Sequence, residues 1–245
     1  MTTDHSVNGE QPILVIGGTR GTGLIIARLL RRHGHRVRVL ARDPARAQTL
    51  FDQAVEVIAG DITKPGTLRP AIEGARHIVF TAGCRSGYPV GESKVKATEY
   101  HGALNTLDAA SALGLPGRFL YMTSSGLLTP SLSTFCLNLW KGNTLVWRRR
   151  VEDDIRASGL EYTIVRTGVL LNREGGQRTI EITQQPLPLS IRYRIARIDV
   201  ARVFVSAMQH PKAARATFEA VWGRRGDPES WSRLLDRVQP DEGPH

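Results

Sequence analysis

The fold is decided by the stretch Gly17-Gly18-Thr19-Arg20-Gly21-Thr22-Gly23, a glycine-rich turn. The apolar run 13–16 before it is typical of a buried strand, and the apolar spacing over 24–30 is typical of a helix packed on a sheet. Such a turn leaves backbone N–H groups free at the helix N-terminus, and its glycines let a pyrophosphate approach without an intervening Cβ. The stretch therefore predicts dinucleotide binding, with a plain glycine-rich turn as the alternative.

The next predicted strand, 36–41, is followed by Arg42, and Arg46 comes one turn later. An acidic residue here would bind the ribose 2′-OH of NAD, whereas arginine suits the 2′-phosphate of NADP. We expect Arg20 to point to the same phosphate. The pair Asp43-Pro44 also fits a helix start, with Asp43 as the N-cap. The arginines favour NADP over NAD as the cofactor.

Length and composition indicate one α/β domain of 245 residues. Residues 1–11 are polar and are expected to form a flexible tail rather than a signal peptide. No apolar stretch approaches the ~20 residues of a membrane span. Cys84 and Cys136 are too few for a disulfide framework and lack metal-ligand spacing, so we expect a cytoplasmic protein without a metal site.

The net charge of +10 comes mainly from arginines scattered along the chain. They form no recognised nucleic-acid motif, so we expect no nucleic-acid partner. Composition bias explains the charge most simply, and an anionic cofactor or substrate is the other interpretation. A small-molecule substrate is expected, and a homodimer is left open.

Strands and helices alternate, which predicts right-handed crossovers and a doubly wound parallel sheet, the Rossmann fold. Ligands of such sheets bind beyond the carboxyl ends of the strands. From about residue 169 the alternation loosens, and a small C-terminal cap on the substrate side is expected, with a helix capped by Asp199. The predicted strands are 13–17, 36–41, 54–58, 76–81, 117–123, 161–166, 177–183 and 217–221, and the predicted helices are 22–33, 44–51, 66–72, 94–113, 143–158, 199–208 and 230–238.

Several short motifs follow these strands, between about residue 13 and residue 221. They are the glycine turn, 37–44, Gly60-Asp61, 80–83, Gly102, 121–125, 156–166 and 197–201. Together they resemble the atypical short-chain dehydrogenase/reductase superfamily, close to its NmrA-like and flavin-reductase-like branch. The spacing of the glycine turn is closer to the Gly-x-x-x-Gly-x-Gly of the main short-chain reductases.

The resemblance implies roles for the matching positions around NADP. Asp61 and Ile62 would lie along the adenine, and Thr81, Ala82 and Gly83 along the adenosine ribose and pyrophosphate. Thr123, Ser124, Arg166, Thr167 and Gly168 would face the nicotinamide. A strand-end turn satisfied by its own backbone is the alternative for Ser124 and for Ser125.

The proton-donating pair Tyr-x-x-x-Lys of this superfamily is missing. Counting back from Glu152 places Thr144 and Arg148 at the two positions, and counting forward from Ser125 places Leu137 and Lys141 there. Neither count supplies a phenol. If the acceptor is a flavin, a quinone or another conjugated molecule, solvent can supply the proton and the protein orients the reactants.

On this hypothesis Ser124 is the polar catalytic contact, with Ser125 as second choice. Arg148 or Lys141 would hold the nicotinamide ribose or an anionic substrate. The segment 127–150 carries Phe135, Trp140 and Trp147, and three interpretations stay open for it: a substrate lid, an interfacial membrane segment, and a packed core or dimer helix.

We therefore expect an NADPH-dependent reductase of a planar small molecule. The alternative is a non-catalytic NADP-binding sensor, regulator or assembly factor of the NmrA-like type. The missing phenol favours the second reading, and the serine and the nicotinamide-side turn favour the first.

Overall fold

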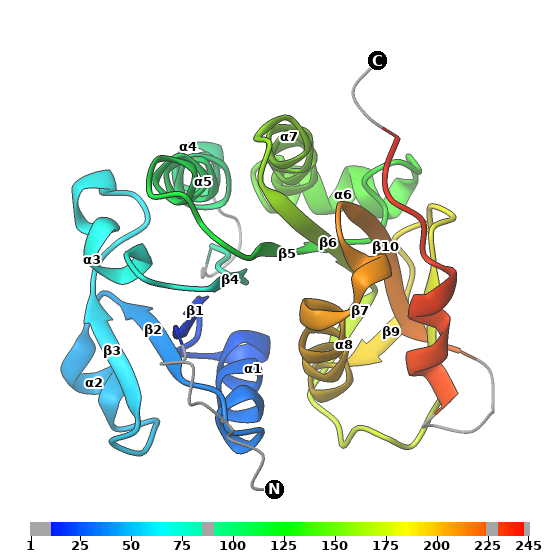
Figure 1. The fold of residues 1–245 in the computed structure, drawn as a ribbon. Coiled ribbons are helices and arrows are strands. Elements are labelled where there is room, and N and C mark those ends of the chain that lie inside the picture. Colours follow the sequence, from blue (N-terminus) through cyan, green and yellow to red (C-terminus); the bar gives the residue numbers. More distant parts are fainter. Residues whose placement is uncertain (1–10, 85–90, 224–229, 243–245) are drawn as a thin grey trace, which may run out of the picture.

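The computed structural model describes residues 11–84, 91–223 and 230–242, so nearly all of the predicted tail lies outside the described residues. An eight-stranded sheet with the order β3-β2-β1-β4-β5-β6-β10-β8 forms the centre (Figure 1). Its strands are parallel except for the antiparallel pair β10–β8. They are β1 (Ile13–Ile16), β2 (Val37–Ala41), β3 (Val55–Ala59), β4 (His77–Phe80), β5 (Arg118–Ser124), β6 (Glu161–Thr167), β8 (Ile180–Thr183) and β10 (Ala216–Trp222).

Helices cover both faces of the sheet, which is why strands such as β1 read as continuous apolar runs. Figure 1 shows α1 and α8 on one face and α5 and α7 on the other. The α-helices are α1 (Gly21–Arg32), α2 (Pro44–Gln48), α3 (Arg69–Ile72), α4 (Glu92–Val95), α5 (Gly102–Ala112), α6 (Leu132–Trp140), α7 (Thr144–Ala157) and α8 (Arg197–Gln209). The π-helical turn η2 (Lys96–His101) joins α4 to α5, and the 3-10 turns are η1 (Pro65–Thr67), η3 (Pro211–Ala213) and η4 (Ser230–Arg237).

The core has two layers, one on each side of the sheet. Ile26 and Leu30 of α1 pack with Val203 and Phe204 of α8 in one layer. Leu107 of α5 packs in the other, together with side chains from α7 and from the opposite faces of the strands. This arrangement confirms the predicted doubly wound sheet. It also sets the carboxyl ends of the parallel strands along one edge, where ligands of such folds bind.

The region after residue 169 divides between two sheets. Helix α8 and strands β8 and β10 complete the main sheet and its layers, while β7 (Val169–Leu171) and β9 (Arg194–Ala196) form a separate parallel pair. That the pair covers a substrate stays a prediction. The expected cap at Asp199 was wrong: α8 begins at Arg197, and the buried Asp199 carboxylate accepts hydrogen bonds from the Gly176 amide and the Trp222 indole.

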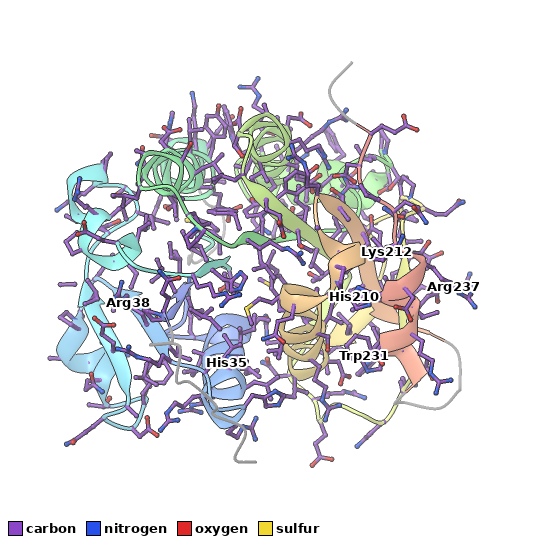
Figure 2. The ribbon with its side chains drawn as sticks, viewed as in Figure 1. His35, Arg38, His210, Lys212, Trp231 and Arg237 are labelled. Atoms are coloured by element: carbon purple, nitrogen blue, oxygen red, sulfur yellow. The ribbon has the colours of Figure 1, made fainter. Side chains whose placement is uncertain are left out.

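No helix in the described part of the chain is long and apolar enough to cross a membrane. The basic side chains are distributed over the molecule rather than gathered: Arg38 lies on the β2 side and Arg237 on the η4 side (Figure 2). Many are used internally. Arg38, for example, pairs with Glu56 at 2.8 Å and donates to the carbonyl oxygens of Ala71 and Glu73.

Candidate functional site

The glycine turn is packed tightly against the loop that follows β4. A Cβ on Gly17 would lie 2.7 Å from the Ala82 amide nitrogen, and Gly17 has a φ of +83°, which favours glycine. A Cβ on Gly23 would lie 2.4 Å from the Gly17 carbonyl oxygen. The Thr81 hydroxyl donates to the Ile16 carbonyl oxygen at 3.0 Å and fastens the β4 end to β1.

The turn leads directly into the N-terminus of α1, which begins at Gly21. The first turn of α1 carries no acidic residue and no side-chain cap, so its positive end is not neutralised by the helix itself. The backbone N–H groups of an uncapped helix N-terminus can donate hydrogen bonds to a pyrophosphate. The residues present therefore fit a dinucleotide.

Two arginines, one inside the turn and one outside it, link the turn to other parts of the chain. Arg20 donates to the Gly83 carbonyl oxygen at 2.8 Å, which links the turn to the β4 loop. Arg197, at the start of α8, donates to the Thr22 hydroxyl at 3.2 Å and to Asn172 at 2.8 Å. Partial burial lowers the pKa of Arg197 from its ordinary value. A bound anion at the turn would stabilise the charged form of Arg197. That Arg197 lies here was not predicted from the sequence.

The residues predicted for the adenosine end of the cofactor lie beyond β2 and β3. Arg42 is exposed, and Asp43 caps α2 by accepting from the Arg46 amide at 3.0 Å, so the helix-start reading of Asp43-Pro44 is confirmed. Partial burial would raise the pKa of Asp61, but hydrogen bonds from Thr63 and the charges of Arg42 and Lys64 lower it below its ordinary value. That the Arg42 charge reads a 2′-phosphate stays a prediction.

Ile62 follows Asp61 and is buried against α5. A Cβ on Gly102 would lie 2.7 Å from Ile62 Cδ1, so a glycine is needed where the helix passes this side chain. Asn105 donates to the Ile62 carbonyl oxygen at 2.8 Å and holds the loop in place. Ile62, which is predicted to lie along the adenine, is therefore buried in the core and held by α5.

The two serines after β5 differ in environment. Ser124 is half-buried and donates to the Ser125 carbonyl oxygen at 3.1 Å. Ser125 is fully buried, and its hydroxyl donates to Glu219 on β10 at 2.6 Å. The Ser124 hydroxyl is thus bonded to the backbone of its own turn, as the alternative interpretation predicts, and a contact between Ser124 and a substrate stays a prediction.

The neighbouring positions are largely occupied by internal contacts. Arg166 is buried and pairs with Glu152 of α7 at 2.6 Å, so its guanidinium holds α7 to β6 instead of facing an open site. The Thr167 hydroxyl donates to the Thr123 carbonyl oxygen at 3.0 Å. A Cβ on Gly168 would lie 2.3 Å from the Tyr193 carbonyl oxygen, so this glycine lets β9 approach closely.

The start of α7 holds a buried polar cluster that includes Arg148. Glu99 of the π-helical turn accepts from Arg148 Nε at 2.8 Å, from the Thr144 hydroxyl, and from the Cys84 amide at 2.9 Å. A Cβ on Gly83 would lie 3.1 Å from Arg148 Nη2, so the guanidinium lies beside the β4 loop. Lys141 ends α6 in the turn before α7.

Thr144 and Arg148 stand one turn apart on α7 and share Glu99, and which of the two counts matches the family's pair stays a prediction. Burial would raise the pKa of Glu99, but the Arg148 charge and the three hydrogen bonds lower it. Burial would lower the pKa of Arg148, but Glu99 raises it. The pair is ionised at neutral pH, and Glu99 fixes the position of the Arg148 cation. Sequence reasoning missed Glu99, although a carboxylate among the apolar positions of a helix is the signal for a buried ion pair.

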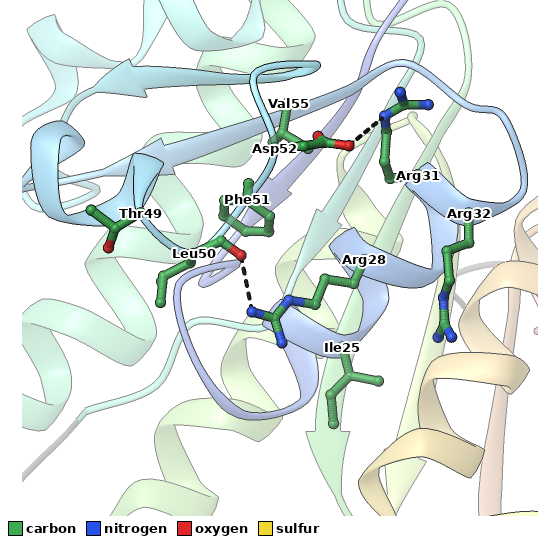
Figure 3. A pocket seen from close by; sticks show the side chains of 9 residues that line it. All are labelled: Ile25, Arg28, Arg31, Arg32, Thr49, Leu50, Phe51, Asp52 and Val55. Atoms are coloured by element: carbon green, nitrogen blue, oxygen red, sulfur yellow. Dashed lines mark hydrogen bonds and ion pairs between the residues drawn. The ribbon is translucent and has the colours of Figure 1, made fainter.

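A hollow lies at the opposite edge of the sheet from the candidate site. It has a volume of about 560 Å³ and lies between the end of α1 and the loop before β3 (Figure 3). Arg28 donates to the Leu50 carbonyl oxygen at 2.9 Å, and Arg31 pairs with Asp52 at 3.6 Å. Because the amino ends of the strands lie here, this hollow is not part of the candidate site. Within the described ranges, no group of His, Cys, Asp or Glu residues is arranged to hold a metal.

Comparison with known proteins agrees with this geometry. The chain is 28% identical to sanguinarine reductase of Eschscholzia californica over 84% of this chain and 87% of that protein. It is also 28% identical to the photosystem II assembly factor Ycf39 of Cyanophora paradoxa, over 92% of this chain and 68% of that protein. An epimerase/dehydratase-like structure from Bacillus halodurans superposes with a TM-score of 0.76 at 23% identity, covering 91% of this chain and 100% of that one, which confirms the fold.

A family model described as NAD(P)H-binding matches residues 17–211, from the glycine turn to the end of α8. The match spans every strand end at which the cofactor positions were predicted, from Gly17 to Gly168. The chain therefore belongs to the NAD(P)H-binding family, and its resemblance to the atypical short-chain dehydrogenase/reductases fits that family.

Proposed function

We propose that this protein is an NADPH-dependent reductase of a planar or conjugated small molecule, such as a flavin or a quinone. One observation carries the proposal: a glycine cradle that fits a dinucleotide lies beside a fixed cation, Arg148, and a half-buried hydroxyl, Ser124. The name of the relative from Eschscholzia californica supports a reductase of this kind.

The bound nicotinamide would supply a hydride. The Glu99 carboxylate holds the Arg148 guanidinium beside the Gly83 loop, where it would bind the nicotinamide ribose or an anionic acceptor. Ser124 would orient the acceptor through one hydrogen bond. Neither Thr144 nor Arg148 can donate a proton as a tyrosine does, so solvent would protonate the product.

The first test is a fluorescence titration with NADPH and with NADH, followed by addition of flavins and quinones while nicotinamide absorbance is recorded. We expect tighter binding of NADPH, and oxidation of NADPH when a suitable acceptor is present. Absence of binding to either nucleotide would overturn the proposal.

A non-catalytic role is the second candidate, favoured by the missing Tyr-x-x-x-Lys pair and by the similarity to a protein named as an assembly factor. In that case the chain would bind NADP as a sensor or regulator. Tight NADPH binding without oxidation across the acceptor panel would support this role over the reductase.

Replacing Ser124 by alanine is expected to reduce turnover about tenfold, because one hydrogen bond to the acceptor is lost. NADPH affinity should stay nearly unchanged. Steady-state kinetics and the nucleotide titration together measure both effects. Ser125→Ala is the matched comparison, since that hydroxyl is buried on Glu219. Unchanged turnover in Ser124→Ala would remove Ser124 from the mechanism.

Replacing Arg42 by alanine is expected to weaken NADPH binding about 30-fold, because the charge-assisted hydrogen bonds to the 2′-phosphate are lost. NADH lacks this phosphate, so its affinity should be nearly unchanged. Arg36→Ala is the matched control, because Arg36 is also exposed but precedes β2 at the opposite edge. An equal loss for the two nucleotides would show that Arg42 does not read the 2′-phosphate.

A further inference from the structure

Helix α6 exposes an apolar surface that nothing in the described part of the chain covers. Leu132, Phe135, Leu139 and Trp140 are 78%, 65%, 69% and 61% exposed. They recur at the spacing that places side chains on one side of a helix. We call these four residues the α6 face. An apolar cluster of this kind on a protein surface marks an interaction site.

The opposite side of α6 fixes the helix on the protein through polar contacts. Ser131 and Thr134 form a capping box at its start. Asn138 accepts a hydrogen bond from the Leu145 amide at 2.9 Å and ties α6 to α7. These contacts fix the orientation of α6, so that the α6 face points away from the protein.

Trp147, the third aromatic residue of this segment, does not belong to the α6 face. It is buried, packs with Val95 and Tyr100, and donates to Glu92 at 3.1 Å. Arg150 lies over its ring at 4.8 Å. Of the three interpretations of the segment 127–150, the packed core holds for Trp147, and the exposed aromatic residues of the segment lie on α6.

Basic side chains lie at the end of the α6 face and behind it. Lys141 ends the helix next to Trp140. The exposed Arg149 lines a groove of about 430 Å³ between α6 and α7 together with Thr134 and Asn138, on the other side of α6 from the face. The acidic residue of this groove, Asp153, pairs with Arg156 at 3.2 Å. Apolar side chains beside cations are the combination that binds the headgroup boundary of an anionic membrane.

We propose that the α6 face docks on an anionic lipid bilayer. A second copy of this chain fits less well, because a two-fold contact through the same face would bring like charges at the helix ends, such as the two Lys141 side chains, toward one another. Each chain also carries a net charge of +10. The proposal concerns binding alone and does not depend on reductase activity.

Co-sedimentation of the full chain with vesicles tests the proposal, without nucleotide or acceptor present. We expect binding to vesicles that contain phosphatidylglycerol, weaker binding to pure phosphatidylcholine, and weakening by salt. The variant Leu132→Gln/Phe135→Gln/Leu139→Gln should bind at least about tenfold less, because glutamine keeps the helix but removes the apolar contact. Ser133→Ala, on the same exposed helix, should bind as the wild type does.

The contribution of charge is tested by Arg149→Gln, with Arg76→Gln at the amino edge of β4 as the matched control. Only the first should weaken binding to the anionic vesicles. A blue shift of tryptophan emission on binding that Trp140→Phe removes would place α6 at the lipid. Equal sedimentation of the triple variant and the wild type would overturn the proposal. A concentration-dependent dimer that the triple variant abolishes, without vesicle binding, would assign the face to a second copy instead.

Discussion

Replacing Gly23 by alanine is expected to weaken NADPH binding by about 100-fold or more, equivalent to about 2.8 kcal/mol. The new Cβ would lie 2.4 Å from the Gly17 carbonyl oxygen and 2.4 Å from the Thr81 hydroxyl. Both atoms belong to the structure that forms the cradle, so the turn must move away from the β4 loop. Overpacking of this kind costs about 1–3 kcal/mol of stability, partly offset by the better helix propensity of alanine.

The measurement combines a nucleotide titration with urea unfolding, so that lost binding is separated from lost folding. Gly66→Ala is the matched control, because nothing lies within 4 Å of a Cβ at that position. It should bind NADPH as the wild type does. If Gly23→Ala remains folded and keeps its NADPH affinity, the cofactor does not bind at this turn.

The fold was predictable because its signals are local. The apolar run of β1, the glycine turn and the periodic apolar positions of α1 lie next to one another in the sequence. The predicted strands through β6 lie within a residue or two of the observed ones. Helix α6 was not among the predicted helices. The apolar residues of the segment 127–150 left three interpretations open, and the exposure of Leu132, Phe135 and Leu139 depends on how the helix packs.

The candidate site was less predictable because its contacts join distant parts of the chain. Glu99 and Arg148 are 49 residues apart, and Ser125 and Glu219 are 94 apart. The identities of these residues do not show which of them form a pair. The strand ends do predict which loops gather at one edge, but the partner that holds each side chain, and whether Ser124 or Ser125 is reachable, depends on packing.

The buried partner of Ser125, Glu219, has an effect on stability that can be measured. Its carboxyl is buried in the central sheet between the Ser125 hydroxyl at 2.6 Å and Arg166, whose Nη1 lies 3.9 Å away. Burial raises the pKa of Glu219 to about 7, although the Ser125 hydrogen bond and the Arg166 charge oppose the shift. The carboxyl therefore holds a proton in the folded state over a range of pH in which the unfolded chain does not.

The sign of the stability effect follows from this difference. Between the ordinary value of 4.5 and about 7 the folded state binds more protons than the unfolded state, so the contribution of Glu219 to stability falls as pH rises. Above about pH 7 Glu219 is charged in the folded state, and the free energy of unfolding is lowered by the full cost of burying that charge. Glu219→Gln has no such charge, so its stability relative to the wild type should increase by about 3 kcal/mol from about pH 5 to about pH 8.

Urea unfolding of both proteins across this range measures the difference. Subtracting the wild-type curve cancels other titrating groups, including His77, whose pKa is lowered by burial to about 4. Glu181→Gln on the neighbouring strand β8 removes an exposed carboxylate and controls for the loss of one negative charge. A stability difference that does not change with pH would mean that Arg166 and Ser125 keep Glu219 ionised, in which case its carboxylate is part of a charged network with Arg166 and Glu152.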